Sequence, residues 1–316
     1  MDTSALFHPE LDADRGTPDP EVDDLLIGAV DLHTHPSPSP FPRRISILDA
    51  ARDAASAGFR AIACKSHHES TQPMILALQS AGLADVGIEV LGGIALNRTV
   101  GGINPYAVEL TLRSGGRVVW FPTLSSFAHV AHTHAADSTF SSNAMNLRPN
   151  EPQSILDENG EIRDVVHDVL SLIAEEDAIL NCGHLSADEI DVLIPAARGA
   201  GVERIVVSHP MFVVGASPER TVGWVRQGAK IEQCIAVARK LDPAELAAYI
   251  DAAGVDNTII SSDFGQKKNP LPVTGFRRMA RALLDAGRSP EDVRKMVGGN
   301  AAQLIERSVA TVGAAS

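Results

Sequence analysis

Residues 27–35 read Ile-Gly-Ala-Val-Asp-Leu-His-Thr-His, and this stretch decides how the rest of the chain is interpreted. A short apolar run that ends in polar residues predicts a buried strand. Alternate residues of a strand face the same side, so His33 and His35 should direct two imidazoles at one point. A His-x-His pair often arises by chance, and its meaning therefore depends on the residues found after the later strands.

Further apolar runs recur along the chain, and each ends in polar residues. Together with the first, they cover residues 27–32, 59–64, 88–94, 118–121, 178–180, 204–207, 229–231 and 258–260. Helical stretches such as 46–57 and 72–80 separate them. Ser186 precedes Glu189 by three residues, which is a capping-box spacing. Pro218, Pro243 and Pro290 fall where helices should begin.

Strands that alternate with helices predict an α/β fold with a parallel sheet, and eight such units predict a (β/α)8 TIM barrel. The predicted organisation is an N-terminal extension (1–26), the barrel (27–308) and a C-terminal tail (309–316), with a long insertion (122–164) after the fourth strand. An open doubly wound sheet is the alternative. No Gly-x-Gly-x-x-Gly follows the first strand, which disfavours a nucleotide-binding version of that sheet.

Composition excludes several classes of function. The chain of 316 residues has a net charge of −13 and no basic run, so neither nucleic acid nor an anionic membrane is an expected partner. It shows neither a secretory signal nor an apolar stretch of the roughly 18 residues that a membrane span needs. Three widely spaced cysteines fit a reducing compartment, so we expect a cytoplasmic protein. A homo-oligomer stays open.

Ligand-type side chains follow the predicted strands repeatedly. They are His33, His35, His67, His68, His184, His209 and Asp263. In a barrel these positions converge on the rim formed by the C-terminal strand ends, where such enzymes keep their active sites. His184 or His209 alone would be interpreted as a core or loop residue, and Asp263 as a turn or helix cap. Their matching positions after strands favour a shared site.

Asp31-Leu-His33-Thr-His35, with the later His184, His209 and Asp263 in that order, resembles the pattern of the amidohydrolase superfamily. The resemblance extends from about Ile27 to Glu306. It implies that His33, His35 and Asp263 bind a metal ion, and that His184 and His209 bind a second ion or position substrate and water. It also implies that Asp263, with His209, is catalytic, as general base and then proton donor.

The chemistry implied by this resemblance is metal-assisted hydrolysis of an amide, cyclic amide, lactone or ester in a small molecule. The ion would lower the pKa of water towards roughly 7. Imidazole and carboxylate ligands suit Zn²⁺, with Mn²⁺, Fe²⁺ or Ni²⁺ as alternatives, in one or two copies per chain. The fourth strand ends without a carboxylated Lys or a Glu to bridge two ions. Lys65 could bridge as a carbamate, orient an anionic substrate, or extend into solvent.

Other polar residues border the predicted rim. Adjacent strand residues face opposite sides, so at most one of His67 and His68 should reach the metal, and we expect substrate contact from them. Glu232 is either a bridging carboxylate or a hydrogen-bond acceptor for a ligating imidazole. Gln266 and two neighbouring lysines would meet a polar or acidic substrate. His129, His132 and His134 form a lid, a substrate-facing loop or a solvated loop.

Three other functions stay open at this point. A metal-dependent decarboxylase or hydratase of a small acid would use the same barrel with one ion, and would release CO2 without incorporating water. A phosphoesterase of the polymerase-and-histidinol-phosphatase type also begins with His-x-His, but it would usually end in Asp-x-His where this chain has Asp263-Phe-Gly. A non-catalytic metal-binding protein would not need Asp263.

Overall fold

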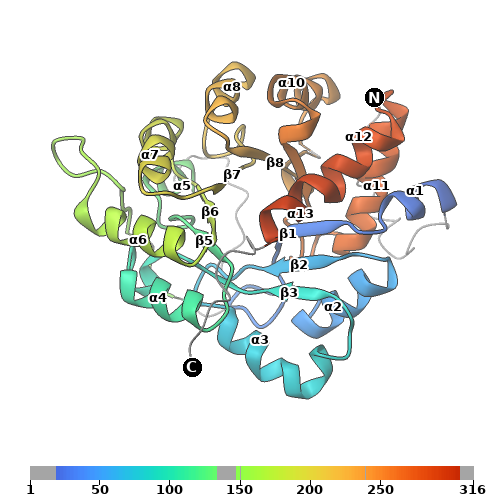
Figure 1. The fold of residues 1–316 in the computed structure, drawn as a ribbon, viewed down its shortest axis with the longest axis horizontal. Coiled ribbons are helices and arrows are strands. Elements are labelled where there is room, and N and C mark those ends of the chain that lie inside the picture. The colour runs from blue at the N-terminus through green and yellow to red at the C-terminus, as the bar shows by residue number, and fades with distance from the viewer. Residues whose placement is uncertain (1–18, 134–146, 150, 239, 307–316) are drawn as a thin grey trace.

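Parallel strands surrounded by helices form the centre of the molecule (Figure 1). The computed structural model describes residues 19–133, 147–149, 151–238 and 240–306. Within them the strands are β1 (Val30–Thr34), β2 (Ala61–Cys64), β3 (Glu89–Leu91), β4 (Gly93–Ala95), β5 (Val118–Trp120), β6 (Ile179–Asn181), β7 (Arg204–Ser208), β8 (Lys230–Cys234) and β9 (Thr258–Ser261). The alternating α/β pattern predicted from the sequence is confirmed.

The strands form two sheets, in the orders β1-β2-β3 and β4-β5-β6-β7-β8-β9, and every pairing is parallel. The single run predicted at 88–94 divides at Gly92, so β3 pairs with β2 and β4 pairs with β5. Beyond β1 and β9, Asp263 N donates to His33 O at 2.8 Å and His35 N donates to Phe264 O at 2.7 Å. The outer edges of the two sheets therefore meet, although the described residues do not form one continuous closed sheet.

Helices follow most strands and pack around the sheets. They are α1 (Pro20–Leu25), α2 (Ile47–Ser56), α3 (Gln72–Leu78), α4 (Pro105–Arg113), α5 (Phe127–Thr133), α6 (Asp164–Glu175), α7 (Ala187–Gly199), α8 (Pro218–Arg226), α9 (Ile235–Ala238), α10 (Pro243–Ala253), α11 (Pro272–Asp285), α12 (Pro290–Arg294) and α13 (Asn300–Ile305). The capping box of Ser186 and Glu189 is confirmed at the start of α7. Pro218, Pro243 and Pro290 begin their helices, as predicted.

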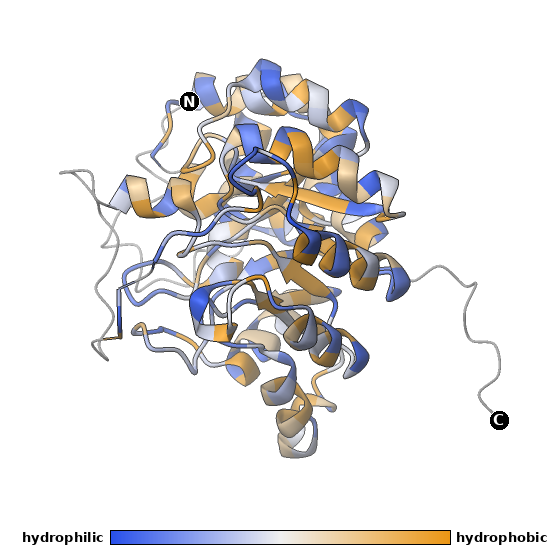
Figure 2. Ribbon diagram, turned by 90° about the vertical axis from the view of Figure 1, so that its left-hand side faces the viewer, coloured by the Kyte–Doolittle hydropathy of each residue, from blue (hydrophilic) through white to orange (hydrophobic). Residues whose placement is uncertain are grey.

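Apolar side chains fill both the space inside the sheets and the space between sheets and helices. Small and branched residues such as Ala61, Ala95, Val206 and Ile259 form one cluster with Leu304 of α13. Two larger clusters hold the helices against the outer strand faces. Figure 2 shows the same division, with hydrophobic strands in the interior and helices that are mixed along their length. This packing holds the strand ends in fixed positions.

The boundary predicted for the N-terminal extension differs from the structure. Residues 20–25 form α1, whose Val22 and Leu25 are buried against the cluster that includes α11 and α12. Two apolar residues in an acidic stretch were too few to reveal this helix by periodicity. The tail at 309–316 lies outside the described residues, as do positions 134–146 and 150 of the predicted insertion.

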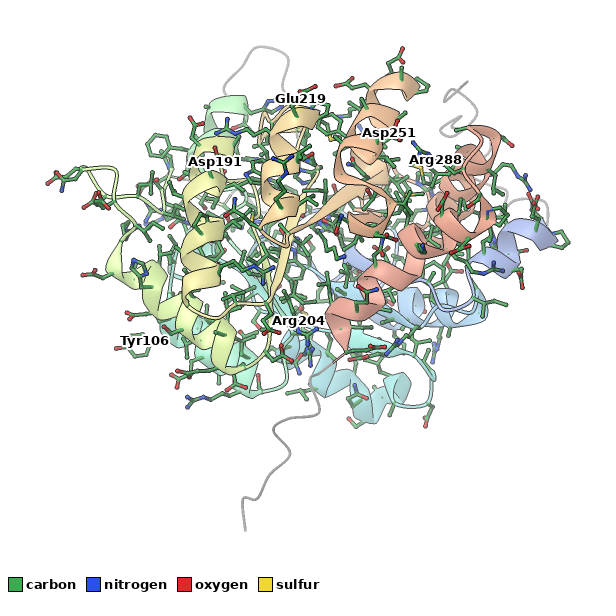
Figure 3. The ribbon with its side chains drawn as sticks, turned by 45° about the horizontal axis from the view of Figure 1, so that its top comes forward. Tyr106, Asp191, Arg204, Glu219, Asp251 and Arg288 are labelled. Carbon is green, nitrogen blue, oxygen red and sulfur yellow. The ribbon has the colours of Figure 1, made fainter. Side chains whose placement is uncertain are left out.

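Arg204 anchors the C-terminal helix at the N-terminal ends of the strands (Figure 3). Its guanidinium pairs with Asp177 at 2.6 Å and donates to the carbonyls of Gln303 and Leu304 at 2.9 and 3.0 Å. On another part of the surface, Tyr106 of α4 is exposed.

Of the helices in the described ranges, none combines the length and apolar character that a bilayer crossing needs.

Gly265 lies where the segment after β9 crosses the segment after β1. Its φ is +135°, and a Cβ there would lie 2.0 Å from the carbonyl oxygen of His35. We expect Gly265→Ala to lower the free energy of unfolding by about 3 kcal/mol, because left-handed strain and overpacking add. Urea denaturation measures this change. Gly287→Ala is the matched control, since Gly287 has a φ of +85° but nothing within 4 Å. Equal losses in the two variants would contradict the close crossing at Gly265.

Candidate functional site

A pocket of about 410 Å³ opens at the C-terminal ends of the strands. The residues that line it are His33, His35, Phe41, Pro42, Arg43, His67, Leu124, His184, His209, Phe212, Asp263, Gln266, Lys267 and Lys268. The five residues predicted as principal ligands therefore meet in one place although the chain separates them by up to 230 positions. His68, Lys65 and Glu232 do not line this pocket.

The imidazoles of His33 and His35 are buried and held through their Nδ1 atoms. His35 Nδ1 lies 3.1 Å from the carbonyl oxygen of Lys65, which can only accept, so Nδ1 carries the proton. His33 Nδ1 lies 3.1 Å from Glu232 Oε2, and this contact places its proton on Nδ1 in the same way. Both rings consequently present Nε2 to the site.

Asp263 faces both of these Nε2 atoms. Its Oδ1 lies 3.1 Å from His35 Nε2 and 3.5 Å from His33 Nε2. Burial raises the pKa of the Asp263 carboxyl, but the interactions with His33 and His35 outweigh burial and hold that pKa well below its usual range. Burial lowers the pKa of His35 to about 3, so its ring is neutral near pH 7. A lone pair on His35 Nε2 therefore faces an anionic oxygen.

This arrangement fits a metal ion. Two acceptors 3.1 Å apart repel each other unless a cation shares them. His33, His35 and Asp263 offer three ligand atoms that lie within 4.8 Å of one another. Neutral imidazoles with an outer hydrogen bond and a carboxylate are the donor set that Zn²⁺ and similar ions use.

Lys65 lies beside the same group of atoms. Its Nζ is 3.0 Å from His33 Nε2 and 5.6 Å from the ring centroid of Trp120. The side chain is only 2% exposed, so the interpretation of Lys65 as a chain that extends into solvent is wrong. Burial lowers the pKa of this amine. Lys65 therefore contacts His33 and does not line the pocket.

Glu232 lies behind His33 and is fully buried. Its Oε2 accepts from His33 Nδ1 and from the Ser208 hydroxyl. Burial raises the pKa of Glu232, but the contact with His33 outweighs it and lowers the pKa to about 2. Cys234 Sγ lies 3.6 Å from both His33 Nδ1 and Glu232 Oε2. The structure thus places Glu232 as an outer partner of an imidazole.

His209 and His184 occupy the next part of the pocket wall, with ring centroids 5.0 Å apart. Burial lowers the pKa of His209 to about 4 and that of His184 well below the usual value, so both rings are neutral near pH 7. His209 Nδ1 is buried and has no hydrogen-bond partner among the described residues. Nδ1 of His184 lies 2.8 Å from Nδ1 of His129, so one of the two nitrogens donates to the other.

His129 belongs to α5, in the predicted insertion, and is buried against His184. The prediction of a solvated loop is therefore wrong for His129. His132, on the same helix, lies with its ring 5.2 Å from that of Phe212, which lines the pocket. His134 lies outside the described residues.

The structure places the adjacent His67 and His68 differently, although both lie beyond the end of β2, where the alternation of strand residues does not apply. His67 lines the pocket, with its ring 4.7 Å from that of His35 and its Nδ1 2.9 Å from Thr123 Oγ1. His68 does not line the pocket, and its ring lies 5.2 Å from that of Phe41. Gln266 lines the pocket, and its Nε2 donates to the Asp263 carbonyl at 2.9 Å.

Backbone strain is concentrated at this site. His209 and Asp263 have φ values of 32° and 51°, in the left-handed region that non-glycine residues rarely adopt. His209 directly follows β7, and Asp263 is the second residue after β9. Such strain persists where the surrounding structure fixes it, commonly at functional sites. Here it turns two polar side chains into the pocket.

Sequence reasoning missed five lining residues, which are Phe41, Pro42, Arg43, Leu124 and Phe212. They lie in the loops after β1, β5 and β7 and have no periodicity that would reveal their position. Asp31 belongs to the Asp-Leu-His-Thr-His motif, but the sequence does not indicate its role. It is fully buried, and its Oδ1 accepts from His33 N at 3.1 Å and from Ser262 N at 3.0 Å, which ties the ends of β1 and β9 together.

A comparison with models of protein families assigns this chain to a family. A model described as a family of unknown function (DUF6282) matches residues 28–232, which contain His33, His35, His184, His209 and Glu232. The chain belongs to the DUF6282 family. No curated protein sequence matches the DUF6282 chain.

Solved structures share the fold of the DUF6282 protein at low sequence identity. A probable dipeptidase, PvdM, from Pseudomonas aeruginosa is 12% identical with a TM-score of 0.61, over 90% of this chain and 96% of that one. An amidohydrolase from the same organism is 12% identical with a TM-score of 0.59, over 90% and 97%. An amidohydrolase from Burkholderia multivorans with bound zinc is 12% identical with a TM-score of 0.50, over 87% and 98%. The predicted amidohydrolase resemblance is thereby confirmed at the level of the fold.

The contact between Glu232 and His33 leads to a testable prediction for the DUF6282 protein. Glu232→Gln removes the charge that holds the His33 ring, so we expect zinc affinity to fall roughly 10–100-fold. Competition with a chromophoric chelator measures that affinity. Glu203→Gln, at an exposed position, is the matched control and should leave the affinity unchanged. An unaltered zinc affinity in Glu232→Gln would show that His33 does not depend on Glu232.

Proposed function

We propose that this protein is a metal-dependent hydrolase that cleaves an amide, cyclic amide, lactone or ester bond of a small molecule. The observation that carries the proposal is the convergence of His33 Nε2, His35 Nε2 and the ionised Asp263 carboxylate beside a pocket. The parallel strands of both sheets direct their C-terminal ends at the site, which supports a (β/α)8 barrel, and the neighbouring folds include an amidohydrolase and a probable dipeptidase.

His33, His35 and Asp263 would hold one divalent ion, with Zn²⁺ as the first candidate. The ion would supply Lewis-acid polarisation of the scissile bond and would lower the pKa of water. Glu232 and the Lys65 carbonyl keep both imidazoles in the tautomer that frees Nε2. A second ion would need His184 and His209, with Lys65 as a carbamate bridge. Lys65 Nζ lies 3.0 Å from His33 Nε2, so Lys65 would have to give up this contact when an ion binds at His33.

The remaining chemistry belongs to side chains in the pocket. The Asp263 side chain is 16% exposed, so its carboxylate can accept a proton from the attacking water and return it to the leaving group. The neutral His209 ring can donate a hydrogen bond to the oxygen on which negative charge develops. His129 fixes the orientation of His184 through the contact between their Nδ1 atoms. Phe212 and Leu124 exclude water from one side.

The experiment is an assay of hydrolysis before and after metal removal. Chelated protein should lose activity towards a panel of lactones, aryl esters and dipeptides, and Zn²⁺, Mn²⁺ or Ni²⁺ should restore it. Substrate turnover in ¹⁸O-labelled water should place the label in the product. Release of CO2 without label would assign the protein to the lyases. Turnover that survives complete metal removal would contradict the proposal.

The expected setting of this activity is the cytoplasm, with a small-molecule substrate and neither nucleic acid nor a membrane as a partner. The net charge of −13 supports the exclusion of polyanions. The pocket volume of about 410 Å³ supports a small substrate. Oligomeric state is a separate question that light scattering answers.

A further inference from the structure

We propose that the pocket selects substrates that carry an anionic group, a carboxylate or a phosphate, and that Arg43, Lys267 and Lys268 bind this group. The inference rests on the proposed function for the reaction itself, but the anion site does not depend on the metal. All three cationic side chains line the same pocket as the metal ligands. They lie on two loops, one after β1 and one after β9.

Backbone hydrogen bonds hold these two loops together. Arg44 N donates to Gly265 O at 2.8 Å, and Lys267 N donates to Pro42 O at 3.3 Å. Arg44 also donates through its side chain to Asn269 O at 2.8 Å. The backbone segments that carry the three cations are thus held together before any ligand binds, which reduces the entropy lost on binding.

The same loops are connected to the metal site. Gln266 Nε2 donates to the Asp263 carbonyl, and Gln266 Oε1 accepts from Asn269 at 2.6 Å. The residue that would handle protons in the reaction therefore belongs to the loop that carries Lys267 and Lys268. A substrate anchored at these cations would have its reacting bond held at a set position relative to Asp263.

Of these three cations, Arg43 is the one whose guanidinium has a buried nitrogen without a hydrogen-bond partner among the described residues. It is half-buried, its guanidinium carbon lies 5.6 Å from the Phe41 ring centroid, and its buried Nε has no hydrogen-bond partner in the described parts of the chain. No ion pair joins it to any described carboxylate within 4.0 Å. A partly buried guanidinium without an acceptor is costly, and a planar carboxylate or a phosphate satisfies it best.

The charge around the pocket differs from that of the whole molecule. The chain carries a net charge of −13, and surface arginines such as Arg220 and Arg281 pair with acids. Among the described residues that line the pocket, Asp263 is the only acid, and it already faces His33 and His35. The pocket therefore has three cations and one carboxylate, and that carboxylate already faces two imidazoles. This excess of positive charge attracts an anion, although the negative net charge of the whole chain would repel it.

The walls define the rest of the substrate. Phe41, Leu124 and Phe212 contribute apolar surface to the same pocket. A ligand that fits should therefore combine an anionic end with an apolar or aromatic body, at a size that a pocket of about 410 Å³ can hold. Neutral amides and peptides without a nearby carboxylate lack the group that Arg43 requires.

Binding to metal-free protein tests the anion site by itself. Ligand-observed NMR would compare benzoate, phenylphosphonate and neutral benzamide as probes. We expect at least one anionic probe to bind about tenfold or more tightly than benzamide, and Arg43→Gln to remove that preference. Which anion binds better distinguishes a carboxylate from a phosphate. Equal binding of all three probes, or binding of none, would overturn the proposal.

Two further variants show whether a loss of binding results from misfolding or from general electrostatics. Lys267→Gln changes an exposed side chain and should weaken the anionic probe several-fold without altering the circular dichroism spectrum. Arg52→Gln removes an exposed cation on α2 that does not line the pocket, and should change nothing. An equal loss in Arg52→Gln and Lys267→Gln would indicate general electrostatics and contradict a specific site.

A matched substrate pair separates this inference from the proposed hydrolase function. The zinc-loaded protein would be assayed with the 4-nitrophenyl monoester of glutaric acid and with 4-nitrophenyl pentanoate, which has a methyl group in place of the carboxylate. We expect kcat/KM to favour the acid by roughly tenfold, and Arg43→Gln to abolish the difference. Equal turnover of both esters would overturn the anion site and leave the hydrolase standing. Binding of an anionic probe without turnover of either ester would overturn the hydrolase function and leave the anion site standing.

Discussion

Asp263→Asn should reduce kcat/KM for hydrolysis by roughly 10³-fold or more, because the variant loses the one carboxylate that the described part of the chain contributes to the pocket. The backbone should tolerate the change. Asp263 has a φ of 51°, and Asn is one of the few side chains that adopt the left-handed region readily. The hydrogen bonds of the Asp263 backbone to His33 and Gln266 do not involve the carboxylate. Steady-state kinetics with saturating zinc measures the loss.

The control for this variant is Asp285→Asn, an exposed carboxylate on α11 whose ion pair to Arg281 is long at 3.8 Å. It should retain full activity and stability. Thermal unfolding of Asp263→Asn should show a folded protein, so that lost activity is not lost structure. Activity within tenfold of the unaltered protein would remove Asp263 from the catalytic role.

The His35→Asn variant should lose more zinc affinity than a change to an outer partner does, and such a change costs roughly 10–100-fold in affinity. The imidazole supplies Nε2 to the site, and the shorter amide of Asn cannot reach the same position. Without the ring, the Asp263 carboxylate also loses its 3.1 Å contact with His35 Nε2. Equilibrium dialysis followed by elemental analysis measures the zinc retained per chain.

His68→Asn provides the matched comparison, since His68 follows a neighbouring strand but does not line the pocket. Its ring lies 5.2 Å from that of Phe41. Zinc content should be unaffected in this variant. If His35→Asn and His68→Asn bind equal amounts of zinc, His35 is not a ligand.

Local pattern explains why much of the fold could be predicted. Each apolar run lies close to a strand, because a parallel strand covered on both faces must be apolar along its length. Ser186 and the prolines at helix starts act within one turn of the chain, so their effect is visible in sequence. His33, His184, His209 and Asp263 could be assembled because strand ends in a parallel arrangement share one edge.

The parts that could not be predicted depend on contacts between distant segments. Nothing near Arg43 in the sequence indicates that its loop pairs with the loop of Lys267. The contact between His129 and His184 joins α5 to the loop after β6 across 55 residues. The sequence allows two interpretations of Glu232, a bridging carboxylate or a hydrogen-bond acceptor, and only its contact with His33 Nδ1 separates them. The split of one apolar run into β3 and β4 results from pairing partners, which periodicity does not carry.

Anomalous diffraction from crystals of the zinc-loaded protein tests the metal centre most directly. We expect a peak at the zinc edge within about 2.0–2.2 Å of His33 Nε2, His35 Nε2 and an Asp263 carboxylate oxygen. A second peak between His184 and His209 would extend the site to two ions. Zinc-loaded crystals with no peak beside His33, His35 and Asp263 would contradict a metal centre at these residues and the hydrolase built on it.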